Sequence, residues 1–368
     1  MLFSPDDYRF MARALLLAQR GLYTTHPNPR VGCVIVKDGQ IIGEGWHERA
    51  GEPHAEIYAL KQAGTLAQGA TVYVTLEPCN HYGRTPPCSL ALVEAQVGKV
   101  IAAMVDPNPQ VVGQGLKRLE QAGIDTTFGL MEAEARALNP GFLSRMERGR
   151  PWIRVKLASS LDGRTAMASG ESVWITGEAA RHDVQYWRAQ AGAILTGIGT
   201  VLYDNPALNV RLISEQLGIK GAVRQPLRVI LDSQLRIPLD AQILTLAGQV
   251  LIYTLNNNTE KSAALEQLGV KVIVIDSSTL DLHQVVQSLV KEGINEVHVE
   301  AGATLSGALL EAQLVDELVL YLAPHFMGST GRPLVQLPLQ HMSERIGLTI
   351  KDMRLVGQDL RVIASPQY

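Results

Sequence analysis

Apolar and polar positions follow two periods along the first part of the chain, one typical of helices and one of strands. The first helix is expected to begin after Ser4, which has Pro5 next to it and Asp7 three residues on, and to end at Gly21. An Asp38-Gly39 turn then joins two short apolar runs into a hairpin. The predicted strands are 31–36, 41–45, 70–76, 99–105 and 125–128, with helices at 54–64, after Pro87 and at 114–122. This alternation predicts an α/β/α domain.

The rest of the chain continues to alternate strands with helices. The predicted strands are 152–158, 193–196, 227–231, 250–254, 270–275, 296–300 and 317–323, and the predicted helices are 176–192, 283–291 and 304–313. Such alternation favours a second, mostly parallel α/β sheet. The charged run 145–151, with Gly149 and Pro151, suits a connector. A length of 368 residues also favours two domains, which we place at 1–147 and 151–368.

Composition and charge exclude several classes of protein. The chain is 46% hydrophobic and 19% charged, as in a globular protein rather than a disordered one. Residues 1–150 carry 15 basic and 15 acidic side chains, without the basic excess of a dedicated nucleic-acid binder. The apolar stretch near the start is interrupted by Arg13, which argues against a signal peptide or a membrane span. Three cysteines do not make a disulfide scaffold, so a cytoplasmic protein is expected.

A zinc site is predicted in the first domain. His54, Cys79 and Cys88 supply one nitrogen and two sulfur ligands, the set of a catalytic zinc with an open fourth position. Both cysteines follow strands and precede helices, where a helix N-terminus favours the thiolate. Glu56 lies two residues after His54, so it need not ligate and can act as the general base and acid. Zinc base deaminases carry this histidine, glutamate and paired-cysteine signature.

Each of these residues taken alone has a structural alternative. A buried cysteine is usually a small apolar side chain, and a histidine after proline is usually part of a turn. Cys33 lies in the apolar strand 31–36 without a partner and is expected in the core. His81, between the two cysteine ligands, is expected either beside the substrate or as a support for the metal ligands, rather than on the metal itself.

The loop between the cysteines departs from the general deaminase pattern. Eight residues separate Cys79 from Cys88, instead of two, and they read Asn-His-Tyr-Gly-Arg-Thr-Pro-Pro. This loop, the segment 25–32 (Thr-His-Pro-Asn-Pro-Arg-Val-Gly) and Gly45-Trp-His resemble the deaminases of the riboflavin pathway. The resemblance implies that Asn28 contacts the pyrimidine and that His47 lies near the ribose phosphate. Asn28 offers both a donor and an acceptor, and His47 and Arg84 could face a phosphate. An asparagine between two prolines is nonetheless most often a turn former, so its spacing alone favours that alternative.

The second domain has no complete dinucleotide fingerprint. Gly197-Ile-Gly199 supplies only the first two glycines of Gly-x-Gly-x-x-Gly. A better phosphate site is the strand-to-helix turn at Gly302, where Thr304 and free N–H groups follow. The alternative is a tight turn at Gly302 with Thr304 as a helix cap.

A second resemblance covers this domain. The motifs Lys-Leu-Ala-Ser-Ser-Leu-Asp-Gly at 156–163, Ser-Val-Trp-Ile-Thr at 172–176, the segment 196–211 and Glu300-Ala-Gly302 are similar to the reductase of the same pathway. It implies a dihydrofolate-reductase-like fold that uses NADPH. The residues implied around the cofactor are Ala158, Trp174, Thr200, Asp204, Ser233, Gly302, Ala303, Thr304, Leu305, Ser306 and Gly307. Those implied around the substrate are Ser172, Arg188, Leu208, Arg211 and Glu300.

Side-chain chemistry supports some of these roles. Arg188 and Arg211 could clamp a ribose phosphate, and Lys156 and Glu300 could orient sugar hydroxyls and pass a proton when the ring opens. Arg188 also lies near Asp183 and Gln185, so a solvated helix face is the alternative.

The sequence therefore predicts a cytidine-deaminase-like zinc domain followed by an NADPH-dependent reductase domain, both acting in riboflavin biosynthesis on a phosphorylated pyrimidine ribosylamine. Two alternatives remain: a tRNA or nucleoside deaminase with an accessory second domain, and a non-catalytic nucleotide sensor in that domain. A homodimer or higher homo-oligomer through the reductase is expected, on the assumption that 317–323 is an exposed strand.

Overall fold

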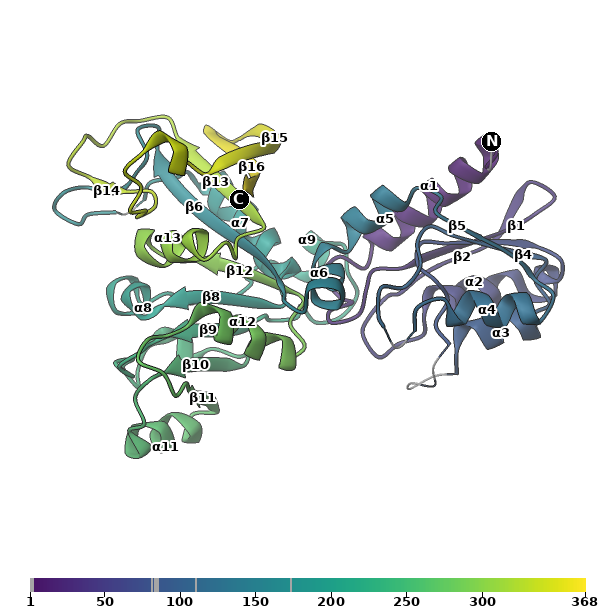
Figure 1. Cartoon of the computed structure of the whole chain (residues 1–368), viewed down its shortest axis with the longest axis horizontal. Coiled ribbons are helices and arrows are strands. Elements are labelled where there is room, and N and C mark those ends of the chain that lie inside the picture. The colour runs from purple at the N-terminus through teal and green to yellow at the C-terminus, as the bar shows by residue number, and fades with distance from the viewer. Residues whose placement is uncertain (1–2, 81, 83–85, 110, 173) are drawn as a thin grey trace. The chain divides into compact units, whose positions relative to one another are not determined.

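A computed structural model describes residues 3–80, 82, 86–109, 111–172 and 174–368, and divides the chain into two compact units (Figure 1). The first unit comprises Met1–Gly149 with Gly218–Lys220, and the second comprises Arg150–Leu217 with Gly221–Tyr368. Among the described residues, no helix combines the length and apolar character needed to cross a bilayer.

The first unit is a five-stranded sheet between helices, in the strand order β2-β1-β3-β4-β5. Strands β1 and β2 form the antiparallel hairpin, β1 also pairs antiparallel with β3, and β3, β4 and β5 are parallel. The strands are β1 (Gly32–Lys37), β2 (Gln40–Trp46), β3 (Thr71–Val74), β4 (Lys99–Ala102) and β5 (Asp125–Phe128). The helices are α1 (Pro5–Gln19), α2 (Ala55–Ala63), α3 (Cys88–Glu94), α4 (Gln114–Gln121), α5 (Glu132–Leu138) and α6 (Pro140–Arg148).

Helices cover both faces of this sheet. Val34 of β1 packs in a cluster with α1 and with residues of α5 and α6, whereas Cys33 packs in a cluster with α2, α3 and α4 on the other face. Gly43 and Gly45 let α2 approach β2 closely, since a Cβ at either position would lie 2.2 Å from a backbone oxygen of α2. This close packing fixes the helix that begins directly after His54.

The second unit is built on a nine-stranded sheet in the order β11-β10-β9-β8-β12-β6-β13-β16-β15. Its strands are β6 (Trp152–Ser160), β8 (Ala193–Gly197), β9 (Leu227–Leu231), β10 (Val250–Thr254), β11 (Val270–Val274), β12 (Glu296–Glu300), β13 (Glu317–Ala323), β15 (Gly347–Val356) and β16 (Asp359–Gln367). A separate ribbon pairs β7 (Arg164–Ala166) with β14 (Arg332–Pro333). The helices are α7 (Glu178–Gln190), α8 (Ile198–Asp204), α9 (Ser214–Leu217), α10 (Gln242–Thr245), α11 (Thr259–Gln267), α12 (Leu282–Lys291) and α13 (Ala303–Glu311).

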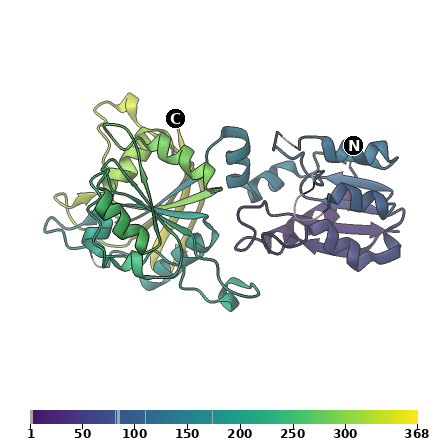
Figure 2. The same ribbon diagram turned by 90° about the horizontal axis from the view of Figure 1, so that it is seen from below.

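The sheet is parallel from β11 to β13, as the alternating pattern predicts, and β16 and β15 add an antiparallel edge. Helices lie on both sides of the strands (Figure 2). Side chains of alternate residues in β6, β8 and β12 enter one large core with α12 and α13. The opposite face is partly polar, because Arg154, Glu296 and His298 are buried there.

Two expectations need correction. The charged run 145–151 is not all connector, because α6 continues through Arg148 and buries Phe142 and Leu143, while Glu147 and Arg148 are exposed. Strand β13 at 317–323 is not exposed, since it is hydrogen-bonded to β6 on one side and to β16 on the other. The edge of the sheet is β15.

Candidate active sites

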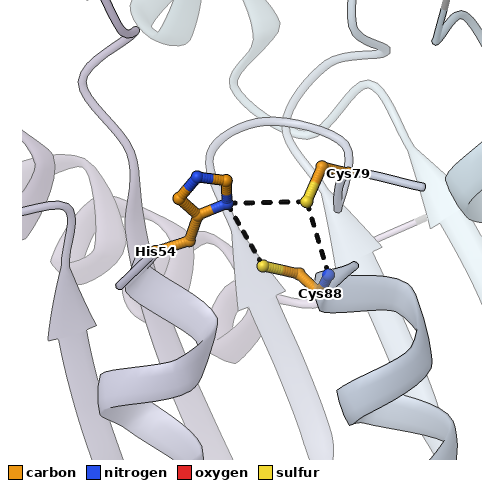
Figure 3. A group of neighbouring side chains, drawn as sticks. All are labelled: His54, Cys79 and Cys88. Atoms are coloured by element: carbon orange, nitrogen blue, oxygen red, sulfur yellow. Dashed lines mark hydrogen bonds between the residues drawn. The ribbon is translucent and has the colours of Figure 1, made fainter. Parts of the chain in front are cut away.

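The three predicted zinc ligands converge at one end of the first unit's sheet (Figure 3). His54 is the N-cap of α2, Cys79 follows β3, and Cys88 is the first residue of α3. The Nδ1 atom of His54 lies 3.5 Å from the Sγ atom of Cys79 and 3.3 Å from that of Cys88. All three ligand atoms lie within 4.8 Å of one another, and one nitrogen with two sulfurs is a donor set that suits zinc. The geometry therefore fits a metal ion bound by three side chains.

Glu56 lies beside this cluster as a buried carboxyl group. It is 3% exposed, and its Oε2 atom has no hydrogen-bond partner among the described residues. Burial raises the pKa of Glu56 to about 7, against the opposing charge of His54. A carboxyl group with a pKa of about 7 can take up and release a proton near neutral pH.

His47 and Asn28 form the next layer of the site. The Nδ1–H of His47 donates to the carbonyl oxygen of Pro53 over 3.1 Å, because a carbonyl can only accept. The Nε2 atom is then the acceptor for the Asn28 amide at 3.0 Å. Burial lowers the pKa of His47, which favours this neutral ring.

Both ring nitrogens of His47 are therefore engaged, and a phosphate contact would require one of these bonds to break. The arrangement also leaves the carbonyl oxygen of Asn28 directed away from His47. Arg84 and His81, two other residues expected near the substrate, lie outside the described residues.

A residue that the sequence reasoning missed lies immediately before the Pro78-Cys79 turn. Glu77 is buried, and its carboxylate accepts hydrogen bonds from backbone N–H groups near the start of α4. The available signal was an acidic residue between an apolar strand and a ligand cysteine, where a solvated charge is not expected.

The second unit contains a cavity of about 1530 Å³. Most of the residues expected around the cofactor and substrate line it: Lys156, Ala158, Ser172, Trp174, Arg188, Thr200, Asp204, Leu208, Arg211, Glu300, Gly302, Ala303, Thr304 and Leu305. Three expected residues do not line it, namely Ser233, Ser306 and Gly307. Ser306 is buried, and Gly307 packs against the backbone of Gln336.

An ion pair forms part of the cavity wall. Arg188 donates to Glu300 twice, from Nε to Oε1 at 2.5 Å and from Nη2 to Oε2 at 2.9 Å. Its Nη1 donates to the carbonyl oxygen of Asn209 at 3.0 Å. Because Arg188 is only 8% exposed, the solvated-face alternative is wrong. Arg188 already donates two hydrogen bonds to Glu300, so fewer of its N–H groups are free to bind a phosphate. This differs from the expectation that Arg188 and Arg211 simply clamp the ribose phosphate.

Lys156 lies next to Glu300 because β12 and β6 are parallel and pair these two residues. Burial lowers the pKa of Lys156, although the charge of Glu300 opposes this effect. Burial alone would raise the pKa of Glu300, but the charge and the hydrogen bonds of Arg188, together with the His298 ring 3.5 Å away, outweigh it and hold that pKa well below its usual range. The cavity therefore contains a firmly ionised carboxylate beside a partly buried amine.

The turn at Gly302 carries the strongest geometric case for a cofactor phosphate. Gly302 is the N-cap of α13 and no side chain caps the helix, so the expected alternative of a Thr304 cap is wrong. The Thr304 hydroxyl instead donates to the Gln336 side chain at 3.1 Å. The first residues of α13 line the cavity, where free N–H groups and the helix dipole favour an anion.

Comparison with known proteins finds one family match in each unit. Residues 4–104 match the family described as the cytidine and deoxycytidylate deaminase zinc-binding region, and residues 151–362 match the RibD C-terminal domain. The riboflavin biosynthesis protein RibD of Escherichia coli K12 is 53% identical over 361 residues, which cover 96% of this chain and 98% of the relative. That of Haemophilus influenzae is 49% identical and covers 99% of both chains.

Solved structures extend the likeness to the whole fold. RibD of Acinetobacter baumannii, form 1, is 50% identical with a TM-score of 0.92 and covers 99% of both chains. A Thermotoga maritima protein described as a diaminohydroxyphosphoribosylaminopyrimidine deaminase/5-amino-6-(5-phosphoribosylamino)uracil reductase is 32% identical, with a TM-score of 0.87, and covers 98% of this chain and 99% of its own. The chain thus belongs to the RibD family of riboflavin biosynthesis proteins, bifunctional enzymes that combine a zinc-binding deaminase domain with a reductase domain.

Proposed function

We propose that the chain deaminates 2,5-diamino-6-(5-phosphoribosylamino)pyrimidin-4-one in its first unit and reduces the ribosyl group of the resulting aminouracil in its second. The observation that carries the proposal is the pairing of two chemically distinct sites in one chain. His54, Cys79 and Cys88 converge beside Glu56 in one unit, and Lys156 faces the Glu300 pair in the other. The description of the Thermotoga maritima relative names the same two reactions for that protein.

The first site supports a hydrolytic deamination. Zinc, when bound, supplies Lewis acidity that makes water a usable nucleophile at neutral pH. Glu56 takes one proton from the attacking water and passes it to the ring nitrogen, and it then takes the second proton from the newly bound hydroxyl and passes it to the departing amine. A pKa of about 7 is well matched to both transfers. The bond from carbon to the exocyclic nitrogen breaks, a carbonyl replaces it, and ammonia leaves. The carbonyl oxygen of Asn28 is available to accept from an N–H group of the pyrimidine.

The second site supports reduction of an opened sugar. NADPH, when bound, supplies the hydride. Glu300 stays ionised and can accept hydrogen bonds from sugar hydroxyls, while Lys156 can pass a proton to the ring oxygen as the ring opens. The buried pair with Arg188 keeps the carboxylate in one orientation, which lowers the entropic cost of aligning the substrate.

The direct test incubates the purified full chain with the diaminopyrimidine substrate and NADPH, and measures ammonia release and NADPH oxidation together. Glu56→Gln is expected to stop the first step alone, and Lys156→Met to stop the second alone when the deaminated product is supplied. Failure of the unmodified chain to release ammonia or to oxidise NADPH would refute the proposal.

We also propose that the chain forms a homodimer through the β15 edge of the reductase. Four exposed apolar residues of β15, Leu348, Ile350, Met353 and Leu355, pair with every second residue of β16, so the irregularity after Ile350 keeps all four on one face. Sedimentation velocity of the chain and of the double variant Ile350→Lys with Leu355→Lys tests this, and an unmodified chain that sediments as a monomer would refute it.

A reducing, cytoplasmic location is proposed because Cys33, Cys79 and Cys88 are free thiols.

A further inference from the structure

Glu77 makes an unusual set of contacts one residue away from the turn that carries Cys79. The side chain is 3% exposed, and both carboxylate oxygens are used. Oε2 accepts from the backbone N–H groups of Asp106 at 3.1 Å and Gly113 at 3.0 Å. Oε1 accepts from those of Gly115 at 2.8 Å and Leu116 at 3.3 Å. Four backbone donors therefore surround one buried carboxylate.

The position of these donors explains how the carboxylate is tolerated in the interior. Gly113 is the N-cap of α4, and Gly115 and Leu116 belong to its first turn. The first N–H groups of a helix lack partners within the helix, and the helix dipole favours a negative charge there. Hydrogen bonds to an ionised acceptor are also shorter and stronger than neutral ones. Glu77 thus completes the start of α4, and α4 in turn holds Glu77.

The same contacts leave the Pro78-Cys79 turn little freedom. A Cβ on Gly115 would lie 1.9 Å from the carbonyl oxygen of Pro78, so the turn packs directly on the α4 backbone. The N–H of Glu77 donates to the carbonyl oxygen of Met104 at 2.9 Å, which fixes the other side of the residue. A displacement of Glu77 would therefore carry Pro78 and Cys79 with it.

Cys79 is in turn joined to the third ligand. The backbone N–H of Cys88 donates to the Sγ atom of Cys79 at 3.3 Å, and the N–H of Ser89 donates to the carbonyl oxygen of Cys79 at 3.2 Å. The chain of contacts runs from the start of α4 through Glu77 to Cys79 and then to the start of α3. One carboxylate thereby connects two helix N-termini with the metal ligands.

We propose that Glu77 is a positioning residue of the metal site, which sets the affinity and geometry of zinc by holding the Pro78-Cys79 turn against the start of α4. The proposal rests on the assignment of His54, Cys79 and Cys88 as zinc ligands in the proposed function. Residues that orient metal ligands without touching the metal commonly change metal affinity about ten- to a hundredfold when they are replaced.

The test uses Glu77→Gln in the full chain. The amide keeps one acceptor oxygen but turns an NH₂ group toward two backbone donors, so half of the contacts are lost. Zinc affinity is measured by competition with a chromogenic chelator, and cobalt substitution reports the ligand geometry through its visible absorption. We expect zinc to bind about ten- to a hundredfold more weakly and the cobalt bands to shift.

Two controls separate positioning from general damage. NADPH-dependent reduction in the second unit of the same molecule should keep its unmodified rate. Leu119→Ala, which removes a fully buried side chain of α4, should lower the melting temperature of the first unit without changing the cobalt spectrum.

The outcomes distinguish this proposal from the assignment of the site itself. If the unmodified chain binds no zinc at submicromolar concentration, the ligand assignment fails. If it does bind zinc and Glu77→Gln has the same affinity and cobalt spectrum, the positioning role is overturned even where the variant is less stable. A weaker affinity with a shifted spectrum, absent in Leu119→Ala, supports it.

Discussion

The ion pair between Arg188 and Glu300 predicts a large and pH-dependent loss of stability for Arg188→Met. The pair is bidentate, and its side chains are only 10% and 13% exposed. Methionine replaces much of the volume of Arg188 but offers no donor. Glu300 would then be a buried carboxylate that retains only the weaker influence of Lys156 and His298.

The magnitude follows from the cost of leaving a buried charge without its partner. Removing one member of a buried pair costs about 3–5 kcal/mol, and we expect about 3 kcal/mol here because Lys156 remains. Glu300→Gln should cost about 2 kcal/mol, since its amide oxygen keeps one of the two bonds. The double variant should cost less than the sum by about 1.5–3 kcal/mol, because the shared contact is lost only once.

The effect should depend on pH in a defined direction. Burial alone would raise the pKa of Glu300, but the environment led by Arg188 holds it well below the usual value. A carboxyl group with a lower pKa in the folded state stabilises the fold above its unfolded pKa of about 4.3. This stabilisation is lost as the pH falls toward the folded pKa. The difference between the unmodified chain and Arg188→Met should therefore be largest at neutral pH and above, and it should shrink as the pH falls through the folded pKa of Glu300 in the variant, which burial raises once Arg188 is absent.

Urea unfolding followed by tryptophan fluorescence measures these free energies in the right part of the molecule. Of the four tryptophans, Trp152, Trp174 and Trp187 belong to the second unit. Arg236→Met, at an exposed arginine of the same unit, is the matched control and should change stability by less than about 0.5 kcal/mol. Additive effects of the two single variants, or a loss for Arg188→Met that does not shrink in acid, would refute the reasoning.

Three further predictions concern the metal, the base and the cavity wall. Glu56→Gln should slow ammonia release about 10²–10⁴-fold while zinc content, and NADPH oxidation with the deaminated product supplied, stay unchanged, and an unslowed variant would exclude Glu56 as the base. Cys88→Ser should lower the zinc content measured by atomic absorption and abolish ammonia release; full retention of both would remove Cys88 from the ligand set. Gly307→Ala should lower the melting temperature, because its Cβ would lie 1.9 Å from the carbonyl oxygen of Gln336. It should also raise the KM for NADPH, because Gln336 lines the cavity and would be displaced. Gly199→Ala, with no atom within 4 Å of its added Cβ, is the stability control and should not lower the melting temperature.

Much of the first site could be predicted from the sequence because its chemistry is local. His54 and Glu56 lie on the same turn, and the two cysteines lie at strand-to-helix junctions that the apolar pattern already indicates. Glu77 was missed because its role depends on donors 29 to 39 residues away. No short motif encodes that distance. The pairing of Arg188 with Glu300, 112 residues apart, was hidden for the same reason.

The strand at the C-terminal edge of the second sheet was hard to predict from the sequence for a different reason. Leu348, Ile350, Met353 and Leu355 do not keep a strict alternation in sequence, because the register shifts between Ile350 and Asp352. A period of two therefore breaks where the strand continues. The helices α5 and α6 were missed because charged residues dominate their exposed faces, and only a few side chains such as Phe142 enter the core.

The burial of Cys33 has a practical chemical consequence. This thiol is fully enclosed between β1 and the α2 side of the sheet, and burial raises its pKa well above the ordinary value, so it stays protonated and unreactive in the native protein. Cys79 is partly exposed and would react once no metal protects it. A thiol-specific reagent applied to the folded chain would therefore leave Cys33 silent. The reaction of the reagent with Cys79 would then measure the loss of zinc rather than the total number of cysteines. It would provide a colorimetric measure of metal occupancy.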